Sequence, residues 1–136
     1  MRGSLQSYRK VSLESEIAVA SPHRIIQMMF AGALERLAQS RYAIEQNDLE
    51  SKGVFINKAI GIITGLSNSL NMEAGGEIAR NLNELYDFML RRISEANLNN
   101  DPQAIDDVMA VLRTIKEGWD AIPADQHHLT SHSEAV

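Results

Sequence analysis

Apolar side chains recur every three to four residues in four segments of this chain, which is the spacing of one face of an α-helix. The pattern predicts helices over residues 21–46, 51–70, 75–98 and 102–122. No segment alternates apolar and polar positions as a half-buried β-strand does. Four helices joined by short connections pack most simply with neighbours antiparallel. The sequence therefore predicts an all-α fold, an antiparallel up-down four-helix bundle.

Two of the helix starts carry strong local signals. Ser21 precedes Pro22, and Asp101 precedes Pro102. A serine or aspartate side chain accepts hydrogen bonds from the free amides of a first helical turn. Proline suits the first helical position because its missing N–H would have no partner within the helix. Pro123 limits the last helix at its other end.

The two ends of the chain differ in character from the predicted bundle. Residues 1–20 are too apolar for an ordinary tail, so we expect a segment or short helix that docks on another surface. Residues 123–136 are polar, which predicts a disordered tail. The chain thus divides into an N-terminal docking segment (1–20), a four-helix bundle (21–122) and a tail (123–136). The apolar positions that we expect to dock are Leu5, Tyr8, Val11 and Ile17.

Composition narrows the classes of function. The chain has 136 residues and no cysteine, so it suits one domain without disulfides or thiolate chemistry. Its net charge of -5 argues against binding to nucleic acid, which needs clustered basic residues. No apolar run reaches the roughly 18 residues that span a bilayer, and no secretory signal is visible. We therefore expect a cytoplasmic protein that does not insert into membranes.

No arrangement of residues predicts catalysis, a metal site or a cofactor site. His23 stands alone at a helix start, where we expect a surface position. The sequence contains no metal-binding His-Glu-x-x-His pattern, glycine-rich phosphate loop or nucleophile elbow. The three histidines of the tail lack the fixed surroundings that a metal site needs. We expect a binding protein and not an enzyme.

The helix predicted over residues 51–70 has a back face with almost no charge. A solvated helix face normally carries charged side chains, so this face indicates contact with a partner. Gly61 and Gly65 lie one turn apart on it, where a partner backbone could approach closely. The alternative is that these glycines only let a neighbouring helix of the same chain pack closely. The face comprises Val54, Asn57, Lys58, Gly61, Gly65, Asn68 and Met72.

Two other predicted helices also have more apolar surface than one core seam needs. The first carries a second row of residues away from its core face, formed by Met28, Ala31, Glu35, Ala38 and Tyr42. Methionine suits such a surface because its flexible side chain adapts to irregular partners. Contact with residues 1–20 is the alternative explanation. The third has a wide apolar arc from Phe88 to Leu90.

Three stretches of the chain together resemble the family of flagellin-specific secretion chaperones known as FliS. The first joins Gln6-Ser7-Tyr8 to the helix start Ala20-Ser21-Pro22 and the run Met28-Met29-Phe30-Ala31-Gly32, in which Phe30 and Ala31 replace the usual tyrosine and aspartate. The second is Lys58-Ala59-Ile60-Gly61-Ile62-Ile63. The third runs from Gly76 to Met89, followed by Ala96-Asn97 and a closing Trp119.

The resemblance implies a function and two partners. Members of this family hold the disordered C-terminal region of flagellin in the cytoplasm, prevent its premature polymerisation and deliver it to the flagellar export gate. The resemblance also implies that the N-terminal segment covers part of the binding groove and docks on the gate, with Leu5 and Tyr8 at the matching positions. We expect client contacts at Met28, Ala31, Tyr42, Val54, Asn57, Gly61, Gly65, Asn68, Met72, Tyr86 and Leu90.

Two other functions would use the same kind of surface or fold. A regulatory bundle could form a weak homodimer or sequester a transcription regulator through the same apolar faces. A small helical enzyme or metal carrier is the other alternative, and it lacks any supporting motif. A disordered client that co-purifies would favour the chaperone, whereas self-association alone would favour the regulatory bundle.

Overall fold

The computed structural model describes residues 21–126, which form the predicted bundle and the first residues after it. Expectations for residues 1–20 and 127–136 lie outside the described residues, and they include the docking positions Leu5, Tyr8, Val11 and Ile17. The described elements are α2 (Pro22–Glu45), α3 (Leu49–Asn68), α4 (Met72–Asn99), α5 (Pro102–Asp120) and the short 3-10 helix η1 (Ala124–Gln126). The predicted all-α bundle is confirmed.

Local capping explains where the helices begin. The side chain of Ser21 accepts a hydrogen bond from the amide of Arg24 at 3.1 Å, which confirms the predicted start of α2. Asp101 accepts one from the amide of Gln103 at 3.0 Å and starts α5. Helix α3 begins two residues earlier than expected because Asp48 serves as its cap. Each cap satisfies an amide that has no partner within its helix.

The start of α4 differs from the expectation that it lies at Gly75-Gly76. A single turn begins at Met72, capped by Asn71, and the helix is broken at Gly76, where φ is 54° and ψ is -127°. A side chain would clash in this backbone conformation, so only glycine adopts it readily. The two glycines therefore mark a kink inside α4 and not its first turn.

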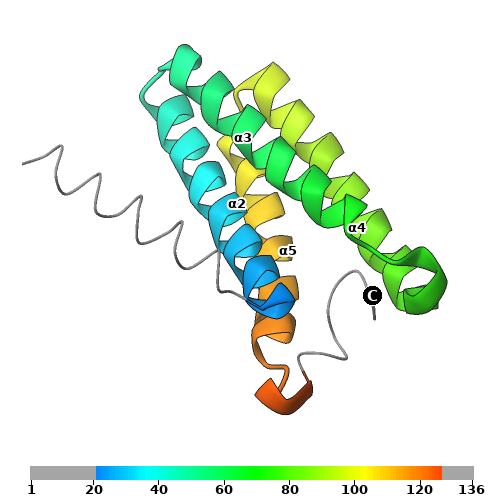
Figure 1. The fold of residues 1–136 in the computed structure, drawn as a ribbon. Coiled ribbons are helices and arrows are strands. Elements are labelled where there is room, and N and C mark those ends of the chain that lie inside the picture. The colour runs from blue at the N-terminus through cyan, green and yellow to red at the C-terminus, as the bar shows by residue number, and fades with distance from the viewer. Residues whose placement is uncertain (1–20, 127–136) are drawn as a thin grey trace, which may run out of the picture.

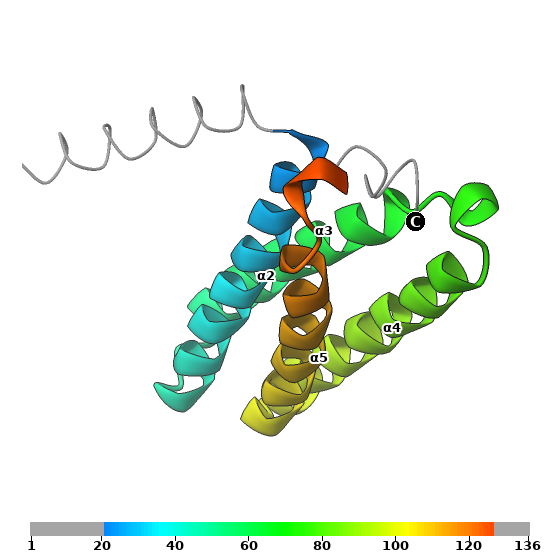
Figure 2. The same ribbon diagram turned by 90° about the horizontal axis from the view of Figure 1, so that it is seen from below.

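The four helices pack in a ring, each beside its neighbours in sequence. Helix α2 packs against α3 and α5, and α4 packs against the same two helices. Figures 1 and 2 show that α4 and α5 meet at the turn that joins them and diverge toward the N-terminus of α4. The edge formed by α2 and α3 thus lies opposite the edge formed by α4 and α5.

The inward faces supply one continuous core. Phe30 and Leu37 from α2, Ile63 from α3 and Leu112 from α5 are fully buried. Burying each such side chain stabilises the fold by about 1.5–3 kcal/mol relative to leaving it exposed. The core residues of the four helices therefore meet, and they hold the outer faces described below in fixed relation. Ile78 and Leu85 share the apolar pattern of residues 75–98 but stay exposed.

Candidate functional site

The second row of α2 lies on the outside of the bundle, as its pattern predicted. Ala31, Glu35, Ala38 and Tyr42 are exposed, and Tyr42 keeps 64% of its surface in solvent. Met28 is half-buried. Glu35 is the only charged residue of the row. A helix turned toward water along this whole length would normally carry more charge, so this row differs from an ordinary solvated face.

The back face of α3 is also exposed, except at Gly65, which is half-buried. Val54 is 47% exposed, and Asn57, Lys58, Gly61 and Asn68 are exposed as well. Met72, which belongs to the first turn of α4, is 43% exposed. Neither neighbouring helix covers these exposed residues, and Lys58 is the only charged one among them. We call the outer row of α2 and the back face of α3 together the α2–α3 face.

The two glycines of α3 have different surroundings. A Cβ atom at Gly61 would meet nothing within 4 Å, so this glycine opens a flat surface to solvent. A Cβ atom at Gly65 would lie 3.1 Å from Cε of Met29 in α2. Gly65 therefore serves the packing of α2 against α3, which was the alternative left open for both glycines. Only Gly61 fits the idea of a close approach by a partner.

A shallow depression of about 490 Å³ joins the two helices on this face. It is lined by Glu35, Ala38, Gln39 and Tyr42 of α2 and by Phe55 of α3. Sequence reasoning missed Phe55 because its helical position lies between the core face and the back face of α3. A half-buried aromatic ring at the seam of two helices supplies the apolar floor that such a depression needs.

Tyr86 and Leu90 lie elsewhere. Tyr86 is fully buried in the core of α4, and burial raises the pKa of its hydroxyl because the charged form would lose its hydration. The expectation that a client contacts Tyr86 therefore conflicts with its position, and Tyr86 is a core residue in this structure. Leu90 is half-buried and packs against the core. Neither residue belongs to the α2–α3 face.

His23 is buried and not at the surface, contrary to the expectation from sequence. It is only 2% exposed, and its ring stacks on Trp119 of α5 with centroids 4.8 Å apart.

Across residues 21–126, no three His, Asp or Glu side chains gather closely enough to hold a metal ion. None of the described helices has the length and hydropathy that crossing a bilayer requires.

A second apolar surface lies between α4 and α5, and sequence reasoning did not single out the α5 side of it. A groove of about 360 Å³ is lined by Leu85 of α4 and by Ala110, Val111, Thr114 and Ile115 of α5. The wide apolar arc that the sequence predicts for α4 is divided by packing. Met89 is buried in the core, whereas Leu85 and Phe88 are each 38% exposed. We call this surface the α4–α5 groove.

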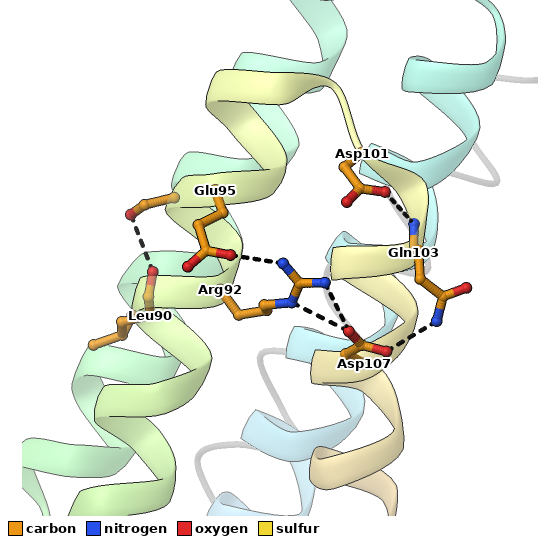
Figure 3. A network of polar contacts seen from close by, with 7 residues as sticks. Leu90, Arg92, Glu95, Asp101, Gln103 and Asp107 are labelled. Carbon is orange, nitrogen blue, oxygen red and sulfur yellow. Dashed lines mark hydrogen bonds and ion pairs between the residues drawn. The ribbon is translucent and has the colours of Figure 1, made fainter.

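A polar network joins the same two helices one turn away from the groove (Figure 3). The guanidinium of Arg92 donates to Asp107 of α5 at 2.9 and 3.1 Å and to Glu95 at 2.6 Å. Gln103 donates to the other oxygen of Asp107 at 2.9 Å. These bonds hold the pKa of Asp107 below its ordinary value, through the hydrogen bond from Gln103 first and the bond and charge of Arg92 next.

Comparison with known proteins confirms the family resemblance. A family profile described as Flagellar protein FliS matches residues 4–126. The flagellar secretion chaperone FliS of Vibrio cholerae is 52% identical over 131 residues, which cover 96% of this chain and 96% of that protein. The flagellar secretion chaperone FliSB of Pseudomonas aeruginosa is 48% identical over 119 residues, 88% of this chain and 94% of the relative.

A third relative extends the same likeness. The flagellar secretion chaperone FliS of Salmonella typhimurium is 49% identical over 119 residues, which cover 87% of this chain and 88% of the relative. The matches include all four helices of the bundle. The shared name describes a chaperone, which is not a class of enzyme.

Proposed function

Because the chain belongs to the FliS family of flagellar secretion chaperones, we propose that it binds the disordered C-terminal region of flagellin in the cytosol. In this proposal, binding prevents premature polymerisation, and the complex then docks on the flagellar export gate. The observation that carries the proposal is the α2–α3 face, an exposed helical surface with only two charged residues, Glu35 and Lys58.

The chemistry of this face suits a short helix or an extended stretch of a client. An amphipathic helix binds by laying its apolar side into a groove between two helices. The depression above Phe55 offers such a groove. Tyr42 lines it, and the exposed side chain of Val54 is next to Phe55 in α3. Ordering a disordered client costs about 2–5 kcal/mol or more, so a broad apolar contact is needed.

The residues proposed to contact the client are the contacts expected from sequence that lie on the α2–α3 face and that solvent reaches. They are Met28, Ala31, Tyr42, Val54, Asn57, Gly61, Asn68 and Met72. Gly65 is not proposed as a contact, because it faces Met29 of α2 and allows these two helices to pack closely. Leu5, Tyr8, Val11 and Ile17 are proposed to cover the face and to dock on the export gate, as the family resemblance implies.

Calorimetry of the full chain with a synthetic flagellin C-terminal segment tests the proposal directly. Val54→Glu places a charge on the α2–α3 face and should weaken binding about tenfold or more. Leu98→Glu is the matched control, because Leu98 is 82% exposed at the far end of α4 and should tolerate the change. Equal affinities for Val54→Glu and the unchanged chain would contradict the proposed face.

Salt dependence gives a second test of the same face. Apolar contact is screened little by salt, whereas contact between exposed charges weakens as the screening length falls to about 8 Å at physiological ionic strength. Affinity for the flagellin segment should therefore change little between low and high salt. If the segment does not bind at all and the chain instead self-associates, the regulatory bundle becomes the better description.

Docking on the export gate requires a separate experiment. Replacement of both Leu5 and Tyr8 by alanine should weaken binding of the flagellin-loaded chain to the purified gate protein. The same variant should bind the flagellin segment at least as well as the unchanged chain. Loss of flagellin binding in this variant would contradict the role proposed for the N-terminal segment.

A further inference from the structure

The α4–α5 groove lies on the edge of the bundle opposite the α2–α3 face, because the helices pack in a ring in which α2–α3 and α4–α5 are separate edges. Exposed apolar residues of α4 continue in a row beyond Leu85, the α4 residue that lines the groove. Ile78 lies two turns before Leu85 on the same side of α4 and is 64% exposed, and Phe88 follows one turn later. From Ile78 to Phe88 the row extends about 15 Å along α4, which is the length of a three-turn helix.

Charge is distributed unevenly between the two edges. Helices α2 and α3 together carry five basic and three acidic side chains, whereas α4 and α5 carry five basic and nine acidic ones. Among the four helices, the acidic excess therefore lies on α4 and α5, the pair that forms the groove. Glu84 and Glu117 are exposed beside its apolar row, adjacent to Leu85 and one turn from Thr114.

Arg92, the basic residue of the polar network beside the groove, is already paired with carboxylates. Arg92 is shared by Asp107 and Glu95, with two carboxylates bound to one guanidinium. Glu95 is the more exposed of the two, with 56% of its side chain in solvent. An incoming partner therefore meets an apolar row with Glu95 and Asp107 at one end and with Glu84 and Glu117 beside it, while Arg91 and Arg113 are the exposed basic residues nearby in sequence.

We propose that the α4–α5 groove is a second docking site, which binds a basic amphipathic helix of a partner protein while the α2–α3 face remains free for another ligand. The helix is about three turns long. Its apolar residues, spaced at i, i+3 or i+4 and i+7, face Leu85, Val111 and Ile115. Its lysine or arginine residues flank that row and face Glu84, Glu95 and Glu117.

Charge complementarity distinguishes binding at this groove from binding at the α2–α3 face, because it makes the affinity depend on salt. Charged rims raise association rates and select partners by charge, and their contribution falls with ionic strength. Binding at the α4–α5 groove is therefore salt-dependent. Because the two sites lie on opposite edges, occupation of one leaves the other accessible.

A pair of designed helical peptides tests the proposal with the full chain. Both are about three turns long with leucine along one side, and they differ only in having lysine or glutamate beside that row. Fluorescence anisotropy should give about tenfold tighter binding of the lysine peptide at low salt, and this difference should shrink near 0.15 M salt. Equal affinities of the two peptides would overturn the proposal.

Two variants locate the binding site. Thr114→Arg places a bulky positive charge in the groove and should weaken binding of the lysine peptide about tenfold. Val54→Arg makes the same kind of change on the α2–α3 face and should leave that binding unchanged. Circular dichroism melting shows whether both variants remain folded. Equal losses of affinity in both variants would overturn the proposal.

Two other occupants of the groove would be revealed by the same measurements. Arg9→Glu combined with Lys10→Glu reverses charges in the N-terminal segment, and a rise in affinity for the lysine peptide would identify that segment as the occupant. A Thr114→Arg variant that turns a dimer into a monomer in sedimentation would identify a second copy of the chain. Either result would overturn the assignment to a partner protein. No change in either measurement supports it.

Discussion

The indole of Trp119 joins the end of α5 to the start of α2. Its Nε1 donates a hydrogen bond to the backbone carbonyl oxygen of His23 at 3.0 Å, and the indole ring stacks on the His23 imidazole at an interplanar angle of 10°. Gln27 and Asp120 add a bond of 2.8 Å between the same two helices. These contacts hold the start of α2 against the end of α5.

Replacing Trp119 by phenylalanine should keep an aromatic ring but remove the donor to the His23 carbonyl. Loss of a buried hydrogen bond costs about 1–3 kcal/mol, so we expect a decrease of about that size in the free energy of unfolding measured in urea. Glu117→Ala, two residues earlier at an exposed position, should change stability by less than about 0.5 kcal/mol. Equal stabilities of the two variants would contradict this role of Trp119.

Substitutions at the two glycines of α3 should have separate effects. Gly65→Leu should lower the free energy of unfolding by about 1–3 kcal/mol, because the new side chain meets Met29 across a packed seam. Gly61→Leu should leave the melting temperature equal or higher, since the site is open and leucine favours helix.

The same pair of variants separates stability from client binding. Calorimetry with the flagellin segment should show weaker binding for Gly61→Leu despite its intact fold. If Gly61→Leu binds the segment as well as the unchanged chain does, the partner does not approach α3 closely at this position.

Lys52 joins α3 to the C-terminal end of α4. Its Nζ donates to the carbonyl oxygen of Asn97 at 3.0 Å and to the side chain of Asn100, and the residue is 8% exposed. Lys52→Met keeps the aliphatic length but removes both bonds, so urea unfolding should show a loss of about 1–3 kcal/mol. Lys58→Met on the exposed side of α3 is the control and should stay within about 0.5 kcal/mol of the unchanged chain.

The kink in α4 should be sensitive to any side chain at Gly76. Its φ of 54° and ψ of -127° are strained for an L-residue, so Gly76→Ala should destabilise the fold by about 1–3 kcal/mol in thermal or urea unfolding. Gly75→Ala is a matched control, because Gly75 has no positive φ. It should instead stabilise by about 0.4–1 kcal/mol. A stabilising Gly76→Ala would show that α4 runs straight through this position.

Acid should weaken the bundle partly through Asp107. Its pKa is lowered in the folded chain, so its contribution is fully present above the unfolded pKa of about 3.9 and is lost as the pH falls through the lower folded pKa. Urea unfolding between about pH 5 and pH 2 should therefore show a smaller decrease in stability for Asp107→Asn than for the unchanged chain. An equal decrease would show that the network around Arg92 contributes nothing to acid stability.

The helices and their ends could be predicted from the sequence because the signals are local. Capping by Ser21 and Asp101 involves residues within three positions, and apolar spacing is a property of each helix alone. The exposed, weakly charged back face of α3 could be predicted for the same reason. Two caps were missed: Asp48, because the polar run before α3 offered several candidates, and Asn71, because the turn that it caps precedes the kink at Gly76.

Features that depend on a distant neighbour could be decided only by the tertiary structure. His23 is buried because Trp119, 96 positions later in the chain, stacks on it. Gly61 and Gly65 are alike in sequence, and only the position of Met29 distinguishes the packing glycine from the open one. Periodicity specifies which side of a helix is apolar. How far two helices diverge, and hence whether the excess apolar surface becomes core or groove, is set by packing between residues far apart in the chain.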